Sequence, residues 1–132
     1  MSMSRPPVAE LGGLNVVVLH GVLSRAPEVR VLPSGDTLTA YELRVPARSG
    51  PAEAVPVVWP GPVPSRLELD AGDAVVVVGR VRRRFFRVGG VTQSRTEVVA
   101  DKVLSGRSPA RARKAIEQAL RRLLDAVVEA AP

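Results

Sequence analysis

The chain has no cysteine, a single histidine (His20) and only four aromatic side chains among its 132 residues. The lack of cysteine excludes disulfides and thiolate metal sites. His20 has no second histidine or cysteine to act with, and the sequence has neither a phosphate-binding glycine loop nor a carboxylate pair typical of catalysis. We therefore expect a protein that is not an enzyme and that needs no cofactor and no metal.

Long apolar runs are missing as well. The densest run, residues 74–78, ends far short of the roughly 20 residues that cross a bilayer. Residues 1–13 hold two prolines and two glycines and lack the apolar segment of a secretory signal, so we expect a flexible leader there. These absences predict no membrane partner and a cytoplasmic, nucleoid-associated location.

Arginine, in contrast, is abundant. The chain carries 19 basic and 13 acidic residues, for a net charge of +6, and 17 of the basic residues are arginine. Arginine binds phosphate through a planar fork of donors and stacks on flat rings. An excess of positive charge suits a polyanion, but it also suits an acidic protein partner or simple solubility. Charge alone leaves the class of partner open.

Apolar runs and alternating segments predict β-structure over residues 14–104. Residues 16–19 form a continuous apolar run, and residues 37–45 alternate between apolar and polar side chains. The first expected strand begins at residue 15, and the other four cover residues 37–45, 55–59, 73–86 and 92–104. A short extended piece is expected at 29–32. Five strands with a short third connection predict a mainly β fold, the OB-fold, which is a partly open five-stranded Greek-key barrel whose open face binds oligonucleotides.

Residues 105–132 have a different pattern, typical of a basic amphipathic C-terminal α-helix. Ser108 suits the N-cap and Pro109 the first helical position. Three uses of this helix remain open: docking on its own barrel, self-association, or binding of nucleic acid. Self-association would use a seam formed by Ile116, Leu120, Leu123 and Val127. Nucleic acid would be bound through Arg111, Arg113, Lys114, Arg121 and Arg122.

The most informative stretch is residues 80–87, Arg-Val-Arg-Arg-Arg-Phe-Phe-Arg. Side chains of a strand alternate between its two faces. Alternation places Arg80, Arg82, Arg84 and Phe86 on one face and Arg83, Phe85 and Arg87 on the other. A cationic row that ends in an aromatic ring is typical of proteins that bind single-stranded nucleic acid. We expect Phe86 to stack on bases and Phe85 to be structural.

Several motifs follow one another as they do in one protein family. They are Asn15-Val-Val-Val-Leu-His-Gly-Val-Leu, Arg25-Ala-Pro-Glu-Val-Arg30, Pro33-Ser-Gly35, Val57-Val-Trp59, Gly72-Asp73, Val78-Gly-Arg80 and Thr96-Glu-Val-Val99. Over residues 14–104 the chain thus resembles the bacterial single-stranded DNA-binding proteins, which are OB-fold homo-oligomers. The resemblance implies sequence-independent binding of single-stranded DNA in replication, repair or recombination, a tetramer or dimer, and replication or repair proteins as further partners.

The resemblance also implies a set of site residues. Trp59 and Phe86 match aromatic positions that stack on bases in the family. We expect phosphate contacts from the arginines near them: Arg30, Arg44, Arg80, Arg82, Arg83, Arg84, Arg87 and Arg95. With so few aromatic side chains in the chain, we expect these arginines to contribute most of the binding energy.

The chain departs from the family in three places. The segment near Glu53 and Ala54 lacks the usual aromatic residue, and Pro60, Pro62 and Pro64 break up the helix between the third and fourth strands. A basic helix stands where the family has a flexible tail with an acidic tip, which argues against recruitment of partners by the usual route. The alternative is therefore an OB-fold protein-interaction module of a replication-restart or related complex, with weak nucleic-acid binding.

Overall fold

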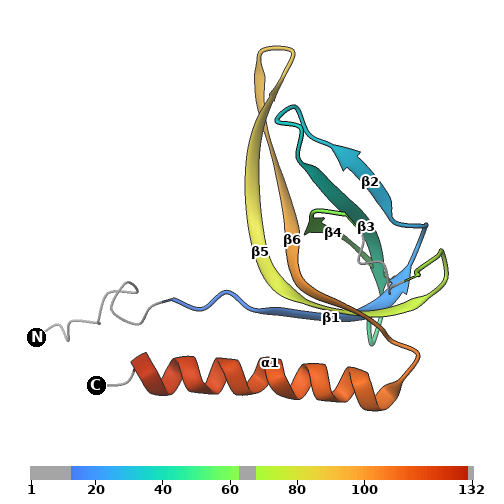
Figure 1. Ribbon diagram of the computed structural model, residues 1–132, viewed down its shortest axis with the longest axis vertical. Helices are drawn as coiled ribbons and strands as arrows, with labels where there is room; N and C mark the ends of the chain where they lie inside the picture. The colour runs from blue at the N-terminus through green and yellow to red at the C-terminus, as the bar shows by residue number, and fades with distance from the viewer. Residues whose placement is uncertain (1–12, 63–67, 131–132) are drawn as a thin grey trace, which may run out of the picture.

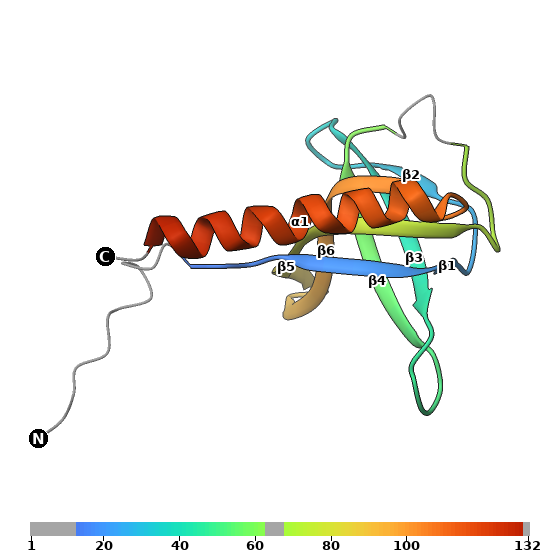
Figure 2. The ribbon, with the colours of Figure 1, turned by 90° about the horizontal axis from the view of Figure 1, so that it is seen from below.

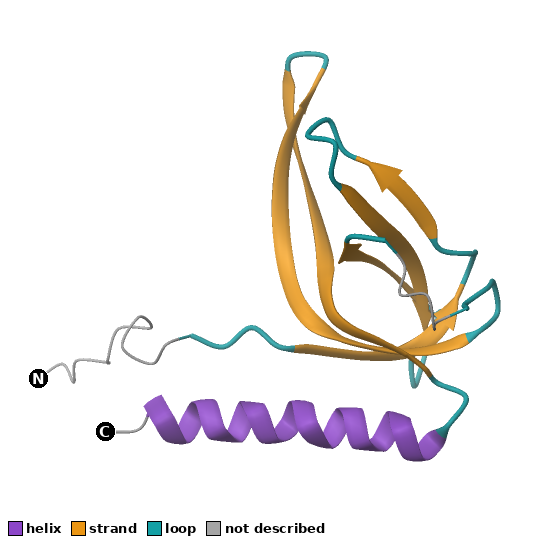
Figure 3. Cartoon of the chain, viewed as in Figure 1, coloured by secondary structure: helices purple, strands orange, loops and turns teal. Residues whose placement is uncertain are grey.

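The computed structural model describes residues 13–62 and 68–130, and it shows a mainly β protein with one helix (Figures 1 and 3). The elements are β1 (Val17–Leu23), β2 (Glu28–Val31), β3 (Thr37–Val45), β4 (Glu53–Pro60), β5 (Ala74–Val88), β6 (Val91–Ser105) and α1 (Pro109–Ala130). The mainly β prediction is confirmed, but the sheet has six strands instead of five, because the short extended piece pairs with β3 as β2. The expected leader, apart from residue 13, and Pro64 lie outside the described residues.

The strands form one sheet in the order β1-β5-β6-β4-β3-β2, and only the β4–β6 pairing is parallel. β1 pairs with β5 along most of its length and with β3 at Val22 and Leu23. The pairings therefore run in a closed circuit through β1, β5, β6, β4 and β3, with β2 on the outer edge of β3. Gly21 permits the close approach of β1 to β3, because a Cβ at this position would lie 2.5 Å from the carbonyl oxygen of Arg44.

β5 and β6 form a long hairpin that extends away from α1 (Figure 1). The strand register shifts between Val78 and Gly79, where a Cβ on the glycine would lie 2.1 Å from the carbonyl oxygen of Val99. Gly89 and Gly90 close the hairpin with φ angles of 56° and 81°, as a tight two-residue turn requires. The arginine-rich stretch at residues 80–87 therefore lies on a projecting hairpin.

The hydrophobic core lies on one face of the curved sheet. It contains Leu23, Tyr41, Leu43, Val57, Val75, Val77, Val98, Ala100 and Val103. Tyr41 and Leu43 alternate with Ala40, Glu42 and Arg44 along β3, so the alternation predicted for this strand is confirmed. Burial of these side chains supplies most of the driving force for folding.

The helix α1 docks on the sheet, as one of its three predicted uses requires, and its later turns extend past the strands (Figure 2). Its start is confirmed, since the Ser108 Oγ accepts a hydrogen bond from the Arg111 amide at 3.4 Å. The buried side chains are Ala112, Ala115 and Ala119, while Leu120 is 52% exposed. Small alanines thus bring the helix close to the sheet, and Leu120 of the seam predicted for self-association lies outside this docking face.

A polar contact holds the turn before α1. Arg107 donates to the Asp73 carboxylate at 2.7 Å, which joins this turn to the start of β5. The Asp70 amide and Arg107 lower the pKa of Asp73, because both stabilise its ionised form. Within the described residues, no helix is both long and apolar enough to cross a membrane.

Candidate nucleic-acid interface

A continuous row of side chains crosses five strands on the face of the sheet opposite the core. The registered pairs are Arg80–Val99, Val99–Val58, Val58–Ala40 and Ala40–Glu28. Directly paired residues lie on the same face, and alternate residues along each strand share it. This row therefore identifies which side chains of β2 to β6 gather on one surface.

We call this surface the arginine face. It carries six strand arginines, and Arg25 of the β1–β2 loop lies at its edge. Its members from the predicted site are Arg30, Arg44, Arg80, Arg82, Arg84, Phe86 and Arg95. The acidic side chains on the same face are Glu28, Glu42 and Glu97. Seven arginines, set against these glutamates and Asp101, which faces Arg80 at 3.7 Å, leave a cationic surface that suits a polyanion.

Glu97 organises the centre of this face. Its side chain is only 2% exposed, and one carboxylate oxygen accepts hydrogen bonds from Arg82 Nη2 at 2.9 Å and Arg84 Nε at 3.1 Å. Both arginine side chains remain 43% exposed. A buried carboxylate therefore fixes two guanidinium groups side by side while their outer edges still reach solvent.

The two phenylalanines of the hairpin lie in different settings. Phe86 is half-buried on the arginine face, with the Arg84 guanidinium carbon 5.4 Å from the centre of its ring. Phe85 lies on the opposite face and is 65% exposed, with Arg83 over its ring at the same distance. Phe85 is therefore not part of the core of this chain, because its ring is largely in solvent.

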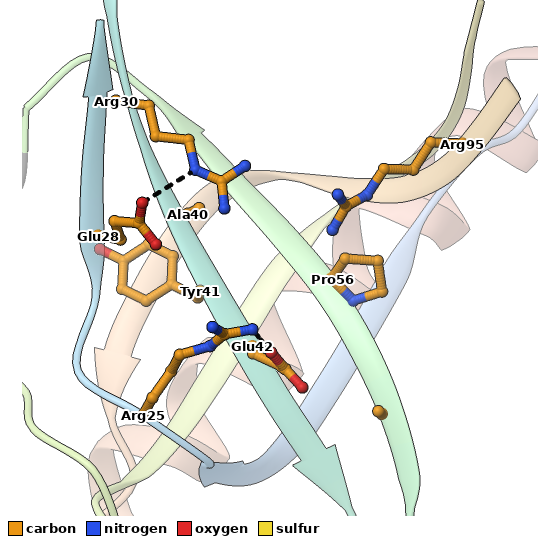
Figure 4. A pocket seen from close by; sticks show the side chains of 9 residues that line it. Arg25, Glu28, Arg30, Ala40, Tyr41, Glu42, Pro56 and Arg95 are labelled. Atoms are coloured by element: carbon orange, nitrogen blue, oxygen red, sulfur yellow. Dashed lines mark hydrogen bonds and ion pairs between the residues drawn. The ribbon is translucent and has the colours of Figure 1, made fainter. Parts of the chain in front are cut away.

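A small hollow of about 200 Å³ lies between the β2–β3 hairpin and β6 (Figure 4). Arg30 of β2 and Arg95 of β6 point toward each other from opposite sides, above Ala40 and Pro56. Arg25 closes the lower side and forms an ion pair with Glu42. Glu28 also lines the hollow and pairs with Arg30 at 3.5 Å, so Arg95 is the lining arginine that pairs with no carboxylate among the described residues. The small floor residues and the remaining positive charge suit a phosphate group.

The hollow is also lined by Tyr41, whose side chain is 4% exposed. Among the described residues its hydroxyl has no hydrogen-bond partner. Burial raises the pKa of this phenol, because desolvation disfavours the phenolate. Tyr41 thus borders the hollow with a hydroxyl that is buried in the core.

A second hollow on the same face, of about 410 Å³, is mostly apolar at its floor. Leu38, Val58 and Pro60 line it, and Arg82 stands at its margin. Apolar floors beside cations can take the flat, uncharged part of a nucleotide while the phosphate remains at the rim. The arginine face thus offers both kinds of surface that a nucleic-acid strand needs.

Three residues of the predicted site do not join this face. Arg83 and Arg87 lie on its reverse, where Arg83 donates to the Ser94 hydroxyl and Arg87 to the Gly90 carbonyl. Trp59 pairs with the buried Thr39 and packs against the core. Strand alternation therefore places its ring outside the arginine face, and its stacking on DNA stays a prediction.

Arg25 and the three glutamates of the face were not predicted as part of the site. Arg25 belongs to a loop, and nothing in its local sequence indicates that it lies beside Arg30 and Arg95. Glu97 did leave a signal, because it is a single acidic residue at the start of an apolar run in a strand. An acidic side chain in that position needs a cationic partner.

Comparisons with known proteins add no family to this geometry. No protein-family model matches the sequence, and no curated protein matches it either. Within the described part of the chain, no group of three or more histidine, cysteine, aspartate or glutamate side chains could hold a metal ion. The arginine face is therefore the feature of this chain that bears on its function.

Proposed function

We propose that this chain is an OB-fold protein that binds single-stranded DNA independently of sequence. The closed circuit of strand pairings supports a small barrel in which β1 completes the ring. The observation that carries the proposal is the arginine face, a cationic surface with Phe86 at one end and hollows along it. Its strand arginines come from β2, β3, β5 and β6.

The binding would be mostly electrostatic. Phosphates of the strand would lie against Arg30, Arg95 and Arg44, releasing the counterions that had neutralised them. Arg82 and Arg84 would contribute as a fixed pair, because Glu97 already holds them in one direction. A protein organised in this way loses little side-chain entropy when the strand binds.

Stacking would add the preference for an unpaired strand. The guanidinium of Arg84 lies over the Phe86 ring, and a base would stack on this cationic pair whatever its identity. A duplex keeps its bases stacked inside and offers only phosphates to this surface. Single strands should therefore bind more tightly than duplexes.

A second function is favoured by one observation on the helix. Leu120 and Leu124 are 52% and 66% exposed on α1, away from its alanine docking face. Exposed leucines of this kind suit a protein contact. The chain could then be an interaction module of a replication-restart or related complex, with nucleic acid bound only weakly.

Fluorescence anisotropy with labelled single-stranded DNA, duplex DNA and RNA of equal length separates these functions. We expect submicromolar binding of single-stranded DNA that strengthens with length, and an affinity that falls steeply as salt is raised. Equal and weak binding of all three ligands would overturn the proposal and favour the interaction module. Tight binding that hardly changes with salt would contradict the electrostatic mechanism.

A further inference from the structure

Trp59 lines a hollow of about 380 Å³. The hollow lies between β6 and the first turns of α1. Its walls include Val103, Leu104 and Ala115, and its cationic members are Lys102, Arg111 and Lys114. The only tryptophan of the chain is thus half-buried in an apolar hollow with three cations around it.

The cations on the helix belong to one stripe of α1. Arg111, Lys114, Gln118 and Arg122 follow one another at spacings of three and four residues, which places them on the same side of the helix. Lys102 of β6 donates to Gln118 Oε1 at 3.1 Å and extends the stripe onto the sheet. A smaller hollow further along the helix is lined by Lys102, Arg121 and Arg122.

Lys102, Arg111 and Lys114 form no ion pairs with carboxylates among the described residues. On α1, Arg113 instead pairs with Glu117 at 3.3 Å. Asp101 also lines the hollow, but its carboxylate faces Arg80 at 3.7 Å. The stripe therefore keeps its charge available for an anionic ligand.

The chemistry of this surface combines a flat aromatic ring, apolar walls and spaced cations. An acidic peptide would use only the cations, whereas a nucleotide uses all three, with its base against the ring and its phosphates on the stripe. The surface is also continuous with the arginine face, since Arg80 on that face is paired with Asp101 at the edge of the hollow. A strand that leaves the arginine face near Arg80 would meet the stripe next.

We propose that the Trp59 hollow and the basic stripe of α1 form a second contact surface for the same single strand of DNA. This inference rests on the proposed function, because the strand must first be held on the arginine face. Strands that are long enough engage both surfaces, whereas short ones occupy the arginine face alone. The helix then has two roles, since it docks through its alanines and binds DNA along the neighbouring stripe.

The intrinsic fluorescence of Trp59 tests this directly, because the sequence has no other tryptophan. The full chain is titrated with oligothymidylates shorter and longer than the roughly 4–16 nucleotides that one such domain covers, with binding followed separately by anisotropy. We expect short oligomers to bind without a change in Trp59 emission. Long oligomers should bind and quench it.

The matched variants are Arg111→Ala with Lys114→Ala, and Arg113→Ala as the control on the other side of α1. The stripe variant should bind long oligomers about tenfold more weakly and short ones normally, as expected from the loss of about two phosphate contacts, while the control should match the wild type. All these side chains are exposed, and thermal unfolding verifies that the variants fold.

The outcomes separate the two proposals. Binding at every length without a Trp59 response and without an effect of the stripe variant overturns this inference and leaves the proposed function intact. No binding of any oligomer overturns both. Quenching by polyglutamate but not by long DNA would assign the hollow to an acidic protein and so also overturn the inference.

Discussion

The two faces of the β5–β6 hairpin carry the same kinds of residue but hold them differently. One face of the hairpin, called the inner face below, belongs to the arginine face. It has Arg82 and Arg84 fixed on the buried carboxylate of Glu97. On the other face, called the outer face below, Arg83 donates a hydrogen bond to the Ser94 hydroxyl and Arg87 donates one to the Gly90 carbonyl of the hairpin turn. Each face also carries one phenylalanine beside an arginine.

Two faces of similar composition therefore differ in how firmly their arginines are held. The carboxylate of Glu97 neutralises part of the positive charge of Arg82 and Arg84, but it also orients their guanidinium groups before a ligand binds. The outer arginines keep their full charge and are held only by neutral acceptors. Because ordering a long side chain on binding costs free energy, the inner arrangement should bind a strand more effectively per residue.

The largest difference should appear in stability. Replacing both Arg82 and Arg84 by alanine would leave the carboxylate of Glu97 buried without a cation. We expect the free energy of unfolding to fall toward the lower end of the ~3–5 kcal/mol typical of broken buried pairs, since both arginines are partly exposed. Urea denaturation measures this change.

The matched outer variant combines Arg83→Ala and Arg87→Ala. It should cost less than about 1 kcal/mol, because exposed hydrogen bonds contribute little. Adding Glu97→Gln to the inner variant should restore much of its loss by removing the buried charge. Equal losses for the inner and outer variants would contradict the role given to Glu97.

The next effect concerns the two aromatic rings. Phe86→Ala should weaken binding of single-stranded DNA by about 1–3 kcal/mol, which is roughly 5- to 150-fold, because a base loses its stacking surface. Phe85→Ala should change the affinity little. Anisotropy titration of both variants decides this, and a larger loss for Phe85→Ala would move the stacking site to the outer face.

The smallest effect is expected in the salt dependence. Arg44 and Arg95 lie on the arginine face, and neither belongs to an ion pair among the described residues. Each alanine substitution there should reduce the slope of log K against log salt by about 0.7, as the loss of one phosphate contact predicts for a single strand. Arg83→Ala and Arg87→Ala should leave the slope unchanged, and a reduced slope for them would extend the interface around the hairpin.

Much of the fold could be predicted from local patterns. The alternation of Tyr41 and Leu43 with polar residues, the Gly89–Gly90 turn and the Ser108 cap are properties of short segments, so the sequence suffices for them. The docking face of α1 could not be predicted in this way. Leucine is more apolar than alanine, but Ala112 and Ala119 permit a closer approach of the helix to the sheet.

The candidate site could be predicted only where it depends on a local pattern within one strand. The side of the strand on which Arg82, Arg84 and Phe86 lie follows from alternation within one strand. The position of Trp59 required the register of β4 against β3 and β6, which no local pattern contains. Arg25 is a similar case, since its nearness to Arg95 depends on how β2 and β6 are placed around the sheet.

By itself, the sequence determined the basic charge, the mainly β character, the terminal helix and the division of residues 80–87 into two faces. Each of these depends on residue type or on spacing within one segment. Only the tertiary structure decided that Glu97 would hold Arg82 and Arg84, that Arg30 and Arg95 would face each other, and that Trp59 would turn toward α1. Such neighbours are set by strand order and register across the whole sheet, because side chains far apart in the chain meet only when the strands between them pair.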